Sequence, residues 1–192
     1  NFSKPYLSNH TAEWLVSGPK YFERFIELID QATQEIQLQT YIFIDDETGK
    51  MVGEALLRAA ERGVKVFVLI DAYGSQAMTS AYRKRLEEAG IHLRTYGELY
   101  SRGRFHIGRR LHRKILLIDG HTAVIGGINI ANHYAGTDKM GPWLDFAIVV
   151  SGPVCSKLEM ICRQRWKDFK FKKTSNSTQK PLLEFKNLAV RV

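Results

Sequence analysis

Cysteine is almost absent from this chain. Its only two cysteines, Cys155 and Cys162, are seven residues apart, which separates them on a helix by about 10.5 Å along the axis. A disulfide needs Cα atoms within about 7 Å of each other, so we expect two buried or inert thiols. The sequence also has no CxxC pair and no cysteine–histidine cluster, and this excludes the common structural zinc motifs.

Long apolar runs are missing as well. No stretch reaches the roughly 18 consecutive apolar residues of a membrane-spanning helix, and no secretory signal pattern is visible near the start. We therefore expect this chain itself to be soluble and to have no transmembrane segment. Because it begins at Asn1 rather than at methionine, we also expect a processed form or an excised piece of a longer protein.

The sequence does have the composition of a globular protein and a surplus of positive charge. Of its 192 residues, 44% are hydrophobic and 25% are charged, and 28 Lys and Arg against 20 Asp and Glu give a formal net charge of +8. A chain of this length forms one domain with a sizeable core. The basic surplus indicates an anionic partner: nucleic acid, a phospholipid surface or a phosphorylated small molecule.

Apolar spacing divides the chain into alternating helices and strands. Helices are expected from Gly18 and over 51–62, 80–89 and 153–169, and strands over 35–43, 64–70, 91–96, 115–118, 123–125 and 144–150. This alternation predicts an α/β/α sandwich with a mixed, largely parallel β-sheet. We assign 1–17 to an N-terminal segment, 18–169 to a catalytic lobe, and 170–192 to a linker that leads into what looks like a second lobe.

The most informative stretch runs from His112 to Asn129. On an extended strand, His112 and Lys114 point to the same face. The Asp119-Gly120 pair predicts a tight hairpin, which brings the following strand back beside the first. The sequence therefore predicts that an imidazole, an ammonium and the amide of Asn129 converge on one small volume.

Such a volume suits a phosphodiester. Lys114 can neutralise a non-bridging oxygen, and Asn129 can donate a hydrogen bond to another. His112 can attack phosphorus or shuttle a proton, while Gly126 and Gly127 let backbone approach a ligand closely. A lone histidine or lysine on a strand is usually structural, but together these residues favour function. Because side chains supply the positive charge, we expect no metal and no cofactor.

The complete pattern is His112-x-Lys114-x4-Asp119-x6-Gly126-Gly127-x-Asn129, and it resembles the HKD motif of the phospholipase D superfamily. Other segments resemble the first lobe of bacterial cardiolipin synthases. They include Tyr41-Ile42-Phe43, Arg62-Gly63-Val64, Asp71 through Ser75, Trp143-x-Asp145, and Gly152-Pro153 with Trp166. The resemblance covers most of the expected catalytic lobe.

The resemblance implies a mechanism and a set of site residues. His112 would attack phosphorus and form a phosphohistidine, while a second HKD histidine protonates the leaving alcohol. Lys114, Asn129, Gly126 and Gly127 would hold the phosphate, and Asp119 would support the catalytic network. The implied reaction is the cardiolipin synthase transfer between two phosphatidylglycerol molecules. The full-length bacterial protein would be membrane-associated, with anionic phospholipid as its partner.

The chain departs from the family pattern because it has only one HKD motif. The other histidines are His10, His92, His106, His121 and His133, and none has lysine two residues on. We therefore expect a half-site that is completed by a second HKD lobe of the same protein or by a second chain. Two alternatives stay open: a metal-independent nuclease or phosphodiesterase that acts on nucleic acid as a homodimer, and a non-catalytic half that only binds anionic phosphate.

Weaker signals surround the motif. Residues 101–118 contain no acid, and their arginines predict a cationic rim for lipid headgroups. The rim would comprise Arg104, Arg109, Arg110 and Arg113. A metal pair of His106 and His112 is rejected because their spacing fits no helical ligand pattern. For Asp45 and Asp46, a role in a loop or at a helix N-terminus is expected rather than paired catalysis.

Overall fold

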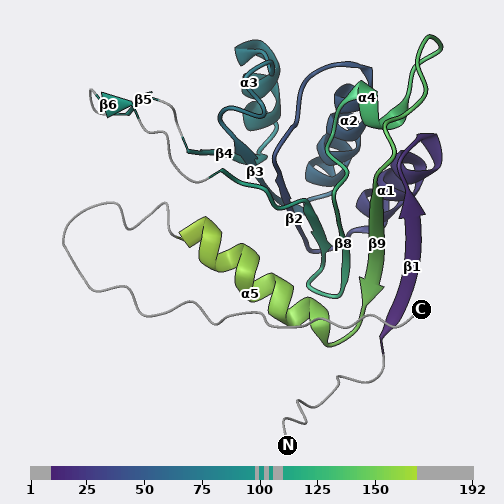
Figure 1. Ribbon diagram of the computed structural model, residues 1–192. Helices are drawn as coiled ribbons and strands as arrows, with labels where there is room; N and C mark the ends of the chain where they lie inside the picture. Colours follow the sequence, from purple (N-terminus) through teal and green to yellow (C-terminus); the bar gives the residue numbers. More distant parts are fainter. Residues whose placement is uncertain (1–9, 98–99, 102–103, 106–109, 168–192) are drawn as a thin grey trace, which may run out of the picture.

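The computed structural model describes residues 10–97, 100–101, 104–105 and 110–167 (Figure 1). Its helices are α1 (Pro19–Gln31), α2 (Glu47–Glu61), α3 (Ser80–Glu88), α4 (Asn132–Ala135) and α5 (Val154–Lys167). Its strands are β1 (Thr11–Val16), β2 (Glu35–Thr40), β3 (Lys65–Asp71), β4 (His92–Tyr96), β5 (Tyr100–Ser101), β6 (Arg104–Phe105), β7 (Ile115–Ile118), β8 (Thr122–Gly126) and β9 (Phe146–Ser151). The expected linker and second-lobe start, residues 170–192, lie outside the described residues.

Seven strands form one mixed sheet in the order β1-β9-β8-β7-β2-β3-β4. Parallel pairing joins β2 to β3 and β3 to β4, whereas the other four ladders are antiparallel. The predicted mixed sheet is confirmed, but its parallel part is smaller than expected. Parallel neighbours need a crossover connection, and in this sheet only the segments that contain α2 and α3 provide one.

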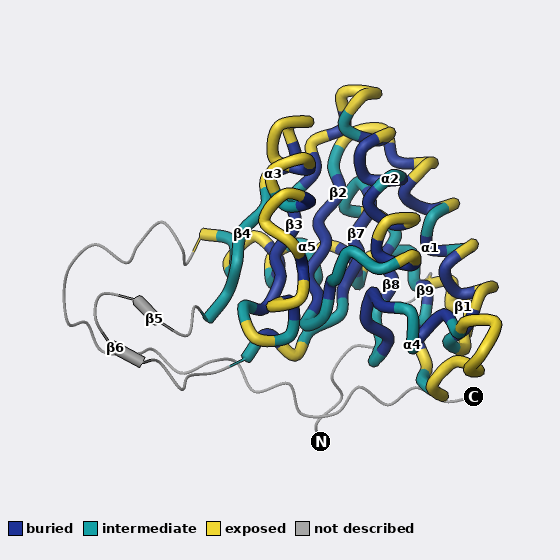
Figure 2. Tube along the Cα trace, turned by 90° about the horizontal axis from the view of Figure 1, so that it is seen from above, coloured by how far each residue is buried: buried dark blue, intermediate teal, exposed yellow. Residues whose placement is uncertain are grey.

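Helices cover both faces of the sheet, which confirms the predicted α/β/α sandwich (Figures 1 and 2). Side chains along β7 alternate between two cores. Leu116 and Ile118 join the large core beneath α1 and α2. Leu117 joins a smaller core with Cys155 of α5. Cys162 of the same helix is also buried, and burial raises the pKa of its thiol to about 12, so the predicted burial of both thiols is confirmed.

The predicted hairpin joins β7 to β8 through residues 119–121, in a tight turn that has Asp119 and Gly120 at its centre. Asp119 and Gly120 have φ angles of 51° and 66°, and the His121 N–H donates to the Ile118 carbonyl over 2.9 Å. Two positive φ angles characterise a type I′ turn, whose twist matches that of the flanking strands. The Asp119-Gly120 signal was therefore sufficient to predict this connection.

The largest differences from the sequence-based expectation are the start of α2 and the presence of a strand before α1. Helix α2 begins at Glu47, four residues before the expected 51–62 range, because the Asp46 side chain accepts a hydrogen bond from the Gly49 N–H and caps the helix. This confirms the expected N-terminal role of Asp46. The expected N-terminal segment, residues 1–17, instead contains β1, which is the outer strand of the sheet beside β9.

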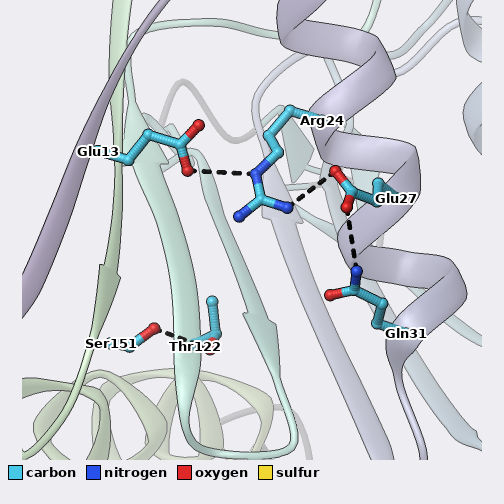
Figure 3. Close-up of polar contacts among 6 residues, drawn as sticks. All are labelled: Glu13, Arg24, Glu27, Gln31, Thr122 and Ser151. Carbon is cyan, nitrogen blue, oxygen red and sulfur yellow. Dashed lines mark hydrogen bonds and ion pairs between the residues drawn. The ribbon is translucent and has the colours of Figure 1, made fainter.

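Polar side chains also connect β1 to α1 and β8 to β9 (Figure 3). Arg24 on α1 lies 3.2 Å from Glu13 on β1 and 2.8 Å from Glu27 on its own helix. The hydroxyls of Thr122 and Ser151 are 2.9 Å apart and link β8 to β9. Exposed ion pairs of this kind contribute at most about 1 kcal/mol each, so the buried cores carry most of the stability. Within the part of the chain that the structure describes, no helix is long and apolar enough to cross a bilayer.

Candidate active site

One end of the sheet gathers most of the predicted site residues. His112 and Lys114 immediately precede β7, and Asn129 follows β8. Because β7 is antiparallel to both β2 and β8, the start of β7 lies beside the ends of the other two strands. We call this end the site edge. His112, Lys114 and Asn129 therefore lie in the same region of the fold, as the sequence predicted.

His112 and Lys114 meet at one aromatic ring. The imidazole of His112 is stacked on the phenol ring of Tyr41, with centroids 5.1 Å apart and planes inclined by 27°. The Lys114 ammonium lies 5.5 Å from the centroid of the same ring, within the range of a cation–π contact. It also donates a hydrogen bond to the backbone carbonyl of His112 over 3.1 Å. The ring of Tyr41 thus contacts the side chains of both His112 and Lys114, which we call the reactive pair after their predicted role, at the site edge.

Lys114 is half-buried, and its surroundings shift the pKa of its ammonium group. Burial lowers the pKa of its ammonium, and the nearby Asp145 carboxylate partly opposes this by raising it. Beneath Lys114 is a small pocket that is also lined by Tyr21, Gln39 and Thr40. Burial, followed by the charge of Asp145, raises the pKa of the Tyr21 hydroxyl well above its usual range. Asp145 therefore acts electrostatically on both groups at this edge.

Asn129 is only 3% exposed and is already held by the protein. Its side-chain oxygen accepts a hydrogen bond from the Ile42 N–H over 3.1 Å and lies 3.5 Å from the Thr40 hydroxyl. Its amide nitrogen donates to the hydroxyl of Tyr134 over 2.7 Å. An amide nitrogen carries two hydrogens, so one is left for a phosphate oxygen, and that binding role stays a prediction.

Gly126 and Gly127 allow neighbouring residues to pack closely against their backbone, and their N–H groups are not free to bind a ligand. Their N–H groups already donate to the carbonyls of Lys114 and Phe146, over 3.3 and 3.0 Å. A Cβ on Gly127 would come within 2.2 Å of Asp145 Oδ1. The group that approaches this backbone closely is therefore the Asp145 carboxylate, and the expectation that these two glycines bind phosphate is revised accordingly.

Asp119 lies at the opposite end of β7 from the reactive pair. Five residues of extended chain separate it from Lys114 by about 16 Å. Its carboxylate accepts hydrogen bonds from the N–H groups of Thr33, Gln34 and Glu35 and from the Thr33 hydroxyl, over 2.8 to 2.9 Å. The structure therefore does not bring Asp119 into the site, and its role is to anchor the loop before β2.

The predicted cationic rim can be followed only at Arg110 and Arg113, and it stays a prediction. The side chains of Arg104 and Arg109 lie outside the described residues. Arg110 donates to the Gly97 carbonyl over 3.2 Å and stands 4.0 Å from a carboxylate oxygen of Asp71. Arg113 is close enough to Cys162 of α5 to oppose the effect of burial on the thiol pKa. Arg110 is thus held within the fold.

Two residues that support the site, Tyr41 and Asp71, were hardly indicated by sequence patterns. Both Tyr41 and Asp71 belong to segments that resemble the family, and the resemblance assigned neither of them a role. The Asp71 carboxylate is fully buried and accepts a hydrogen bond from the Leu111 N–H, next to His112. A carboxylate directly after a run of buried residues was the one available signal for it.

Comparison with known proteins assigns this fold and motif to a family. Residues 25–139, which include the reactive pair and Asn129, match the family model described as "Cardiolipin synthase, PLD-like domain". The chain belongs to the phospholipase D-like family. This confirms the resemblance on which the sequence-based predictions relied.

Relatives of this phospholipase D-like chain include two cardiolipin synthases. Cardiolipin synthase A of Pseudomonas putida (strain W619) is 36% identical over 166 residues, which cover 84% of this chain and 34% of the relative. Cardiolipin synthase B of Salmonella typhi is 40% identical over 147 residues, covering 75% of this chain and 35% of the relative. The chain thus spans about a third of the length of these relatives.

A solved structure shows the same fold. The phospholipase D family member Nuc from Salmonella typhimurium aligns with a TM-score of 0.64 at 20% sequence identity, covering 83% of this chain and 95% of Nuc. At this identity the likeness concerns the architecture alone. It agrees with a mixed sheet that is covered by helices on both faces.

Proposed function

We propose that this phospholipase D-like chain supplies one half of the active site of a phosphatidyltransferase of the cardiolipin synthase type. The substrate would be phosphatidylglycerol, which donates its phosphatidyl group to a second phosphatidylglycerol molecule. The observation that carries the proposal is the placement of His112 and Lys114 on the ring of Tyr41 at the site edge. The cardiolipin synthase relatives support the choice of reaction.

In the proposed mechanism, a ring nitrogen of His112 attacks phosphorus and the bond from phosphorus to the glycerol headgroup breaks. A histidine of a second HKD unit gives its proton to the leaving glycerol oxygen. The same histidine then removes the proton from a hydroxyl of the incoming phosphatidylglycerol, whose oxygen attacks phosphorus and breaks the phosphorus–nitrogen bond. Lys114 neutralises charge on a non-bridging oxygen throughout, which stabilises both transition states.

The second histidine would come from a second HKD lobe of the same full-length protein. Two observations support this partner. The relatives are about three times as long as the aligned segment. Beside the site edge, the large apolar side chains of Trp143, Leu144 and Phe146 are 56%, 76% and 51% exposed within one short segment, and exposed apolar surface that gathers in one place is typical of an interface. Because the substrates are bilayer lipids, the complete protein would work at a membrane.

The test compares variants of the full-length protein on phosphatidylglycerol vesicles. His112→Ala should reduce cardiolipin formation by at least about 10³-fold, as expected when a nucleophile is removed. His121→Ala is the matched control, because this exposed histidine lies on the turn at the opposite end of the sheet, and it should stay close to wild type. Phosphatidyl-labelled enzyme should be trapped with wild type but not with His112→Ala. Retained activity in His112→Ala would reject the nucleophile assignment.

A nuclease is the second candidate function, and the net charge of +8 favours it because nucleic acid is a polyanion. Assaying DNA beside phosphatidylglycerol separates the two reactions. Cleavage of DNA that depends on His112, with no cardiolipin formed, would replace the transferase proposal. Binding of anionic vesicles by wild type and His112→Ala alike, with no turnover of either substrate, would instead indicate a non-catalytic phosphate-binding half.

A further inference from the structure

The carboxylate of Asp71 is buried at the end of β3 and fully occupied by backbone donors. None of its side chain is exposed. Asp71 Oδ1 accepts hydrogen bonds from the N–H groups of Tyr73 and Gly74, over 2.9 and 3.2 Å. Asp71 Oδ2 accepts one from the Leu111 N–H over 2.8 Å. The first two donors lie in the loop that follows β3, whereas the third lies 40 residues away along the chain.

That third donor fixes the backbone immediately before His112. Leu111 is itself buried, and the His112 N–H turns back to donate to the Arg110 carbonyl over 3.1 Å. The Arg110 guanidinium lies 4.0 Å from Asp71 Oδ1. Asp71 therefore holds the main chain of Leu111 and the side chain of Arg110, the two residues through which the chain reaches His112.

The same loop also fixes the ring on which the imidazole is stacked. The Ser75 hydroxyl donates to the Tyr41 carbonyl over 3.1 Å and accepts from the Phe43 N–H over 3.0 Å. A Cβ on Gly74 would come within 2.2 Å of the Tyr41 carbonyl oxygen, so the loop and the end of β2 are in close contact. Residues 71–75 thus set both the backbone that carries His112 and the position of the Tyr41 ring.

We propose that Asp71 is a positioning residue for His112, which acts by holding the Leu111 N–H so that the imidazole stays against Tyr41 and directed at the substrate phosphorus. The inference rests on the proposed function, in which His112 is the reacting group. A buried carboxylate is costly unless it is fully paired, and this one is paired in part with the segment that delivers the nucleophile. A displacement of about 1 Å at a reacting atom can cost about 100-fold in rate.

Asp71→Asn is the informative variant because both oxygens of Asp71 accept hydrogen bonds. The substitution replaces one oxygen with an amino group, so either Leu111 or the Tyr73–Gly74 pair must face a donor instead of an acceptor. Asp45→Asn is the matched control. Asp45 lies in the loop after β2, and its two oxygens accept hydrogen bonds from the N–H and the hydroxyl of Thr79, but neither bond leads to His112.

Two readouts on the full-length protein test the proposal. In phosphatidylglycerol vesicles, Asp71→Asn should lower kcat by about 100-fold while KM changes by less than about threefold, and Asp45→Asn should stay within about twofold of wild type in both. In amide hydrogen exchange, the Leu111 and His112 amides should exchange about 10-fold faster in Asp71→Asn, as loss of one buried hydrogen bond implies. A purely structural role would instead leave kcat of the folded variant unchanged, and that result overturns the proposal.

A second variant covers the case in which Asp71→Asn does not fold. Arg110→Gln keeps the carboxylate but removes the cation beside it, and it should lower kcat roughly fivefold to tenfold, as loss of an interaction worth about 1 kcal/mol implies. Full kcat in Arg110→Gln would then overturn the proposal. If the wild-type protein forms no cardiolipin, the proposed function fails and amide exchange alone decides the positioning role. Faster exchange at His112 in Asp71→Asn but not in Asp45→Asn supports it, and equal exchange rejects it.

Discussion

The imidazole of His112 rests against the phenol ring of Tyr41, with their centroids 5.1 Å apart and their planes only 27° from parallel. The two residues reach this contact from different strands. Tyr41 directly follows β2, and His112 leads into β7. The position of the proposed nucleophile therefore depends on the antiparallel pairing of these strands and on the ring at the end of one of them.

Replacing Tyr41 tests this stacking. Tyr41→Leu should lower kcat roughly threefold to tenfold, because a stacked aromatic pair is worth about 0.5–1.5 kcal/mol. Tyr41→Phe keeps the ring and should stay within about twofold of wild type. Steady-state assays of both variants on phosphatidylglycerol vesicles supply the measurement. An equal loss in Phe and Leu would show that the hydroxyl matters rather than the stacked ring.

Asp145→Asn should move the alkaline limit of activity to lower pH. Burial lowers the pKa of Lys114, and Asp145 raises it, so removing the Asp145 charge leaves the ammonium to lose its proton at a lower pH. The Phe146 N–H, which donates to Asp145 Oδ1 over 2.7 Å, can still donate to the amide oxygen of the variant. The measurement is the pH dependence of kcat/KM for wild type and variant.

Asp138→Asn is the control for this shift, because Asp138 is an exposed carboxylate in the loop that precedes β9. It should leave the alkaline limit where it is in wild type. An upward movement in Asp145→Asn, or the same movement in both variants, would contradict the assigned influence of Asp145 on Lys114.

Asp119→Asn should weaken the fold while sparing the reaction. The variant loses the charge and the acceptors for about half of the hydrogen bonds to residues 33–35, which implies a loss of about 2–3 kcal/mol of unfolding free energy. The kcat of the folded variant should stay within about twofold of wild type. Urea unfolding at neutral pH and vesicle assays provide the two measurements. Wild-type stability together with lost activity would instead place Asp119 in the catalytic network.

The contribution of Asp119 to stability should also depend on pH. Burial opposes its ionisation, but hydrogen bonds from Glu35, Thr33 and Gln34 outweigh burial and hold its pKa below the ordinary 3.8. A carboxyl whose pKa is lower in the folded state stabilises the fold above its unfolded pKa and loses that effect as the pH falls through the folded value. The stability difference between wild type and Asp119→Asn should therefore be full at pH 7 and shrink below about pH 4.

Gly127→Ala should disturb the site through Asp145. The added methyl group would stand 2.2 Å from Asp145 Oδ1, so the carboxylate must move away, and kcat should fall roughly 10-fold to 100-fold. Gly141→Ala is the control because a Cβ there meets nothing within 4 Å, and it should behave as wild type. Normal kcat and an unchanged pH profile in Gly127→Ala would show that the position of Asp145 is not critical.

Local patterns were sufficient to predict the elements that are encoded locally. The apolar residues of β7 and the Asp119-Gly120 pair after them predict the strand and its type I′ turn, because both depend on neighbours in sequence. Strand β1 could not be predicted in the same way. Most of its residues are exposed, and it is a strand because it pairs with β9, which lies more than 100 residues further along the chain.

The site residues also divide into those that local patterns predict and those that depend on tertiary packing. His112 and Lys114 were predicted from their two-residue spacing on one strand. The contact of Asp71 with Leu111 depends instead on which strand ends lie at one edge of the sheet. The side-chain oxygen of Asn129 accepts a hydrogen bond from the Ile42 N–H, just after β2, and this contact was not predicted. Such contacts arise from tertiary packing, and the spacing of the motif does not contain them.

The anchoring role of Asp119 gives a physical meaning to the interval between the lysine and the aspartate of the motif. The four residues 115–118 form the whole of β7. The number of residues between Lys114 and Asp119 therefore equals the length of this strand. One inserted residue would turn every following side chain to the other face and would detach the acid from the loop at 33–35. An engineered chain with one residue inserted between Lys114 and Asp119 would therefore keep every residue type of the motif and still lose this fold.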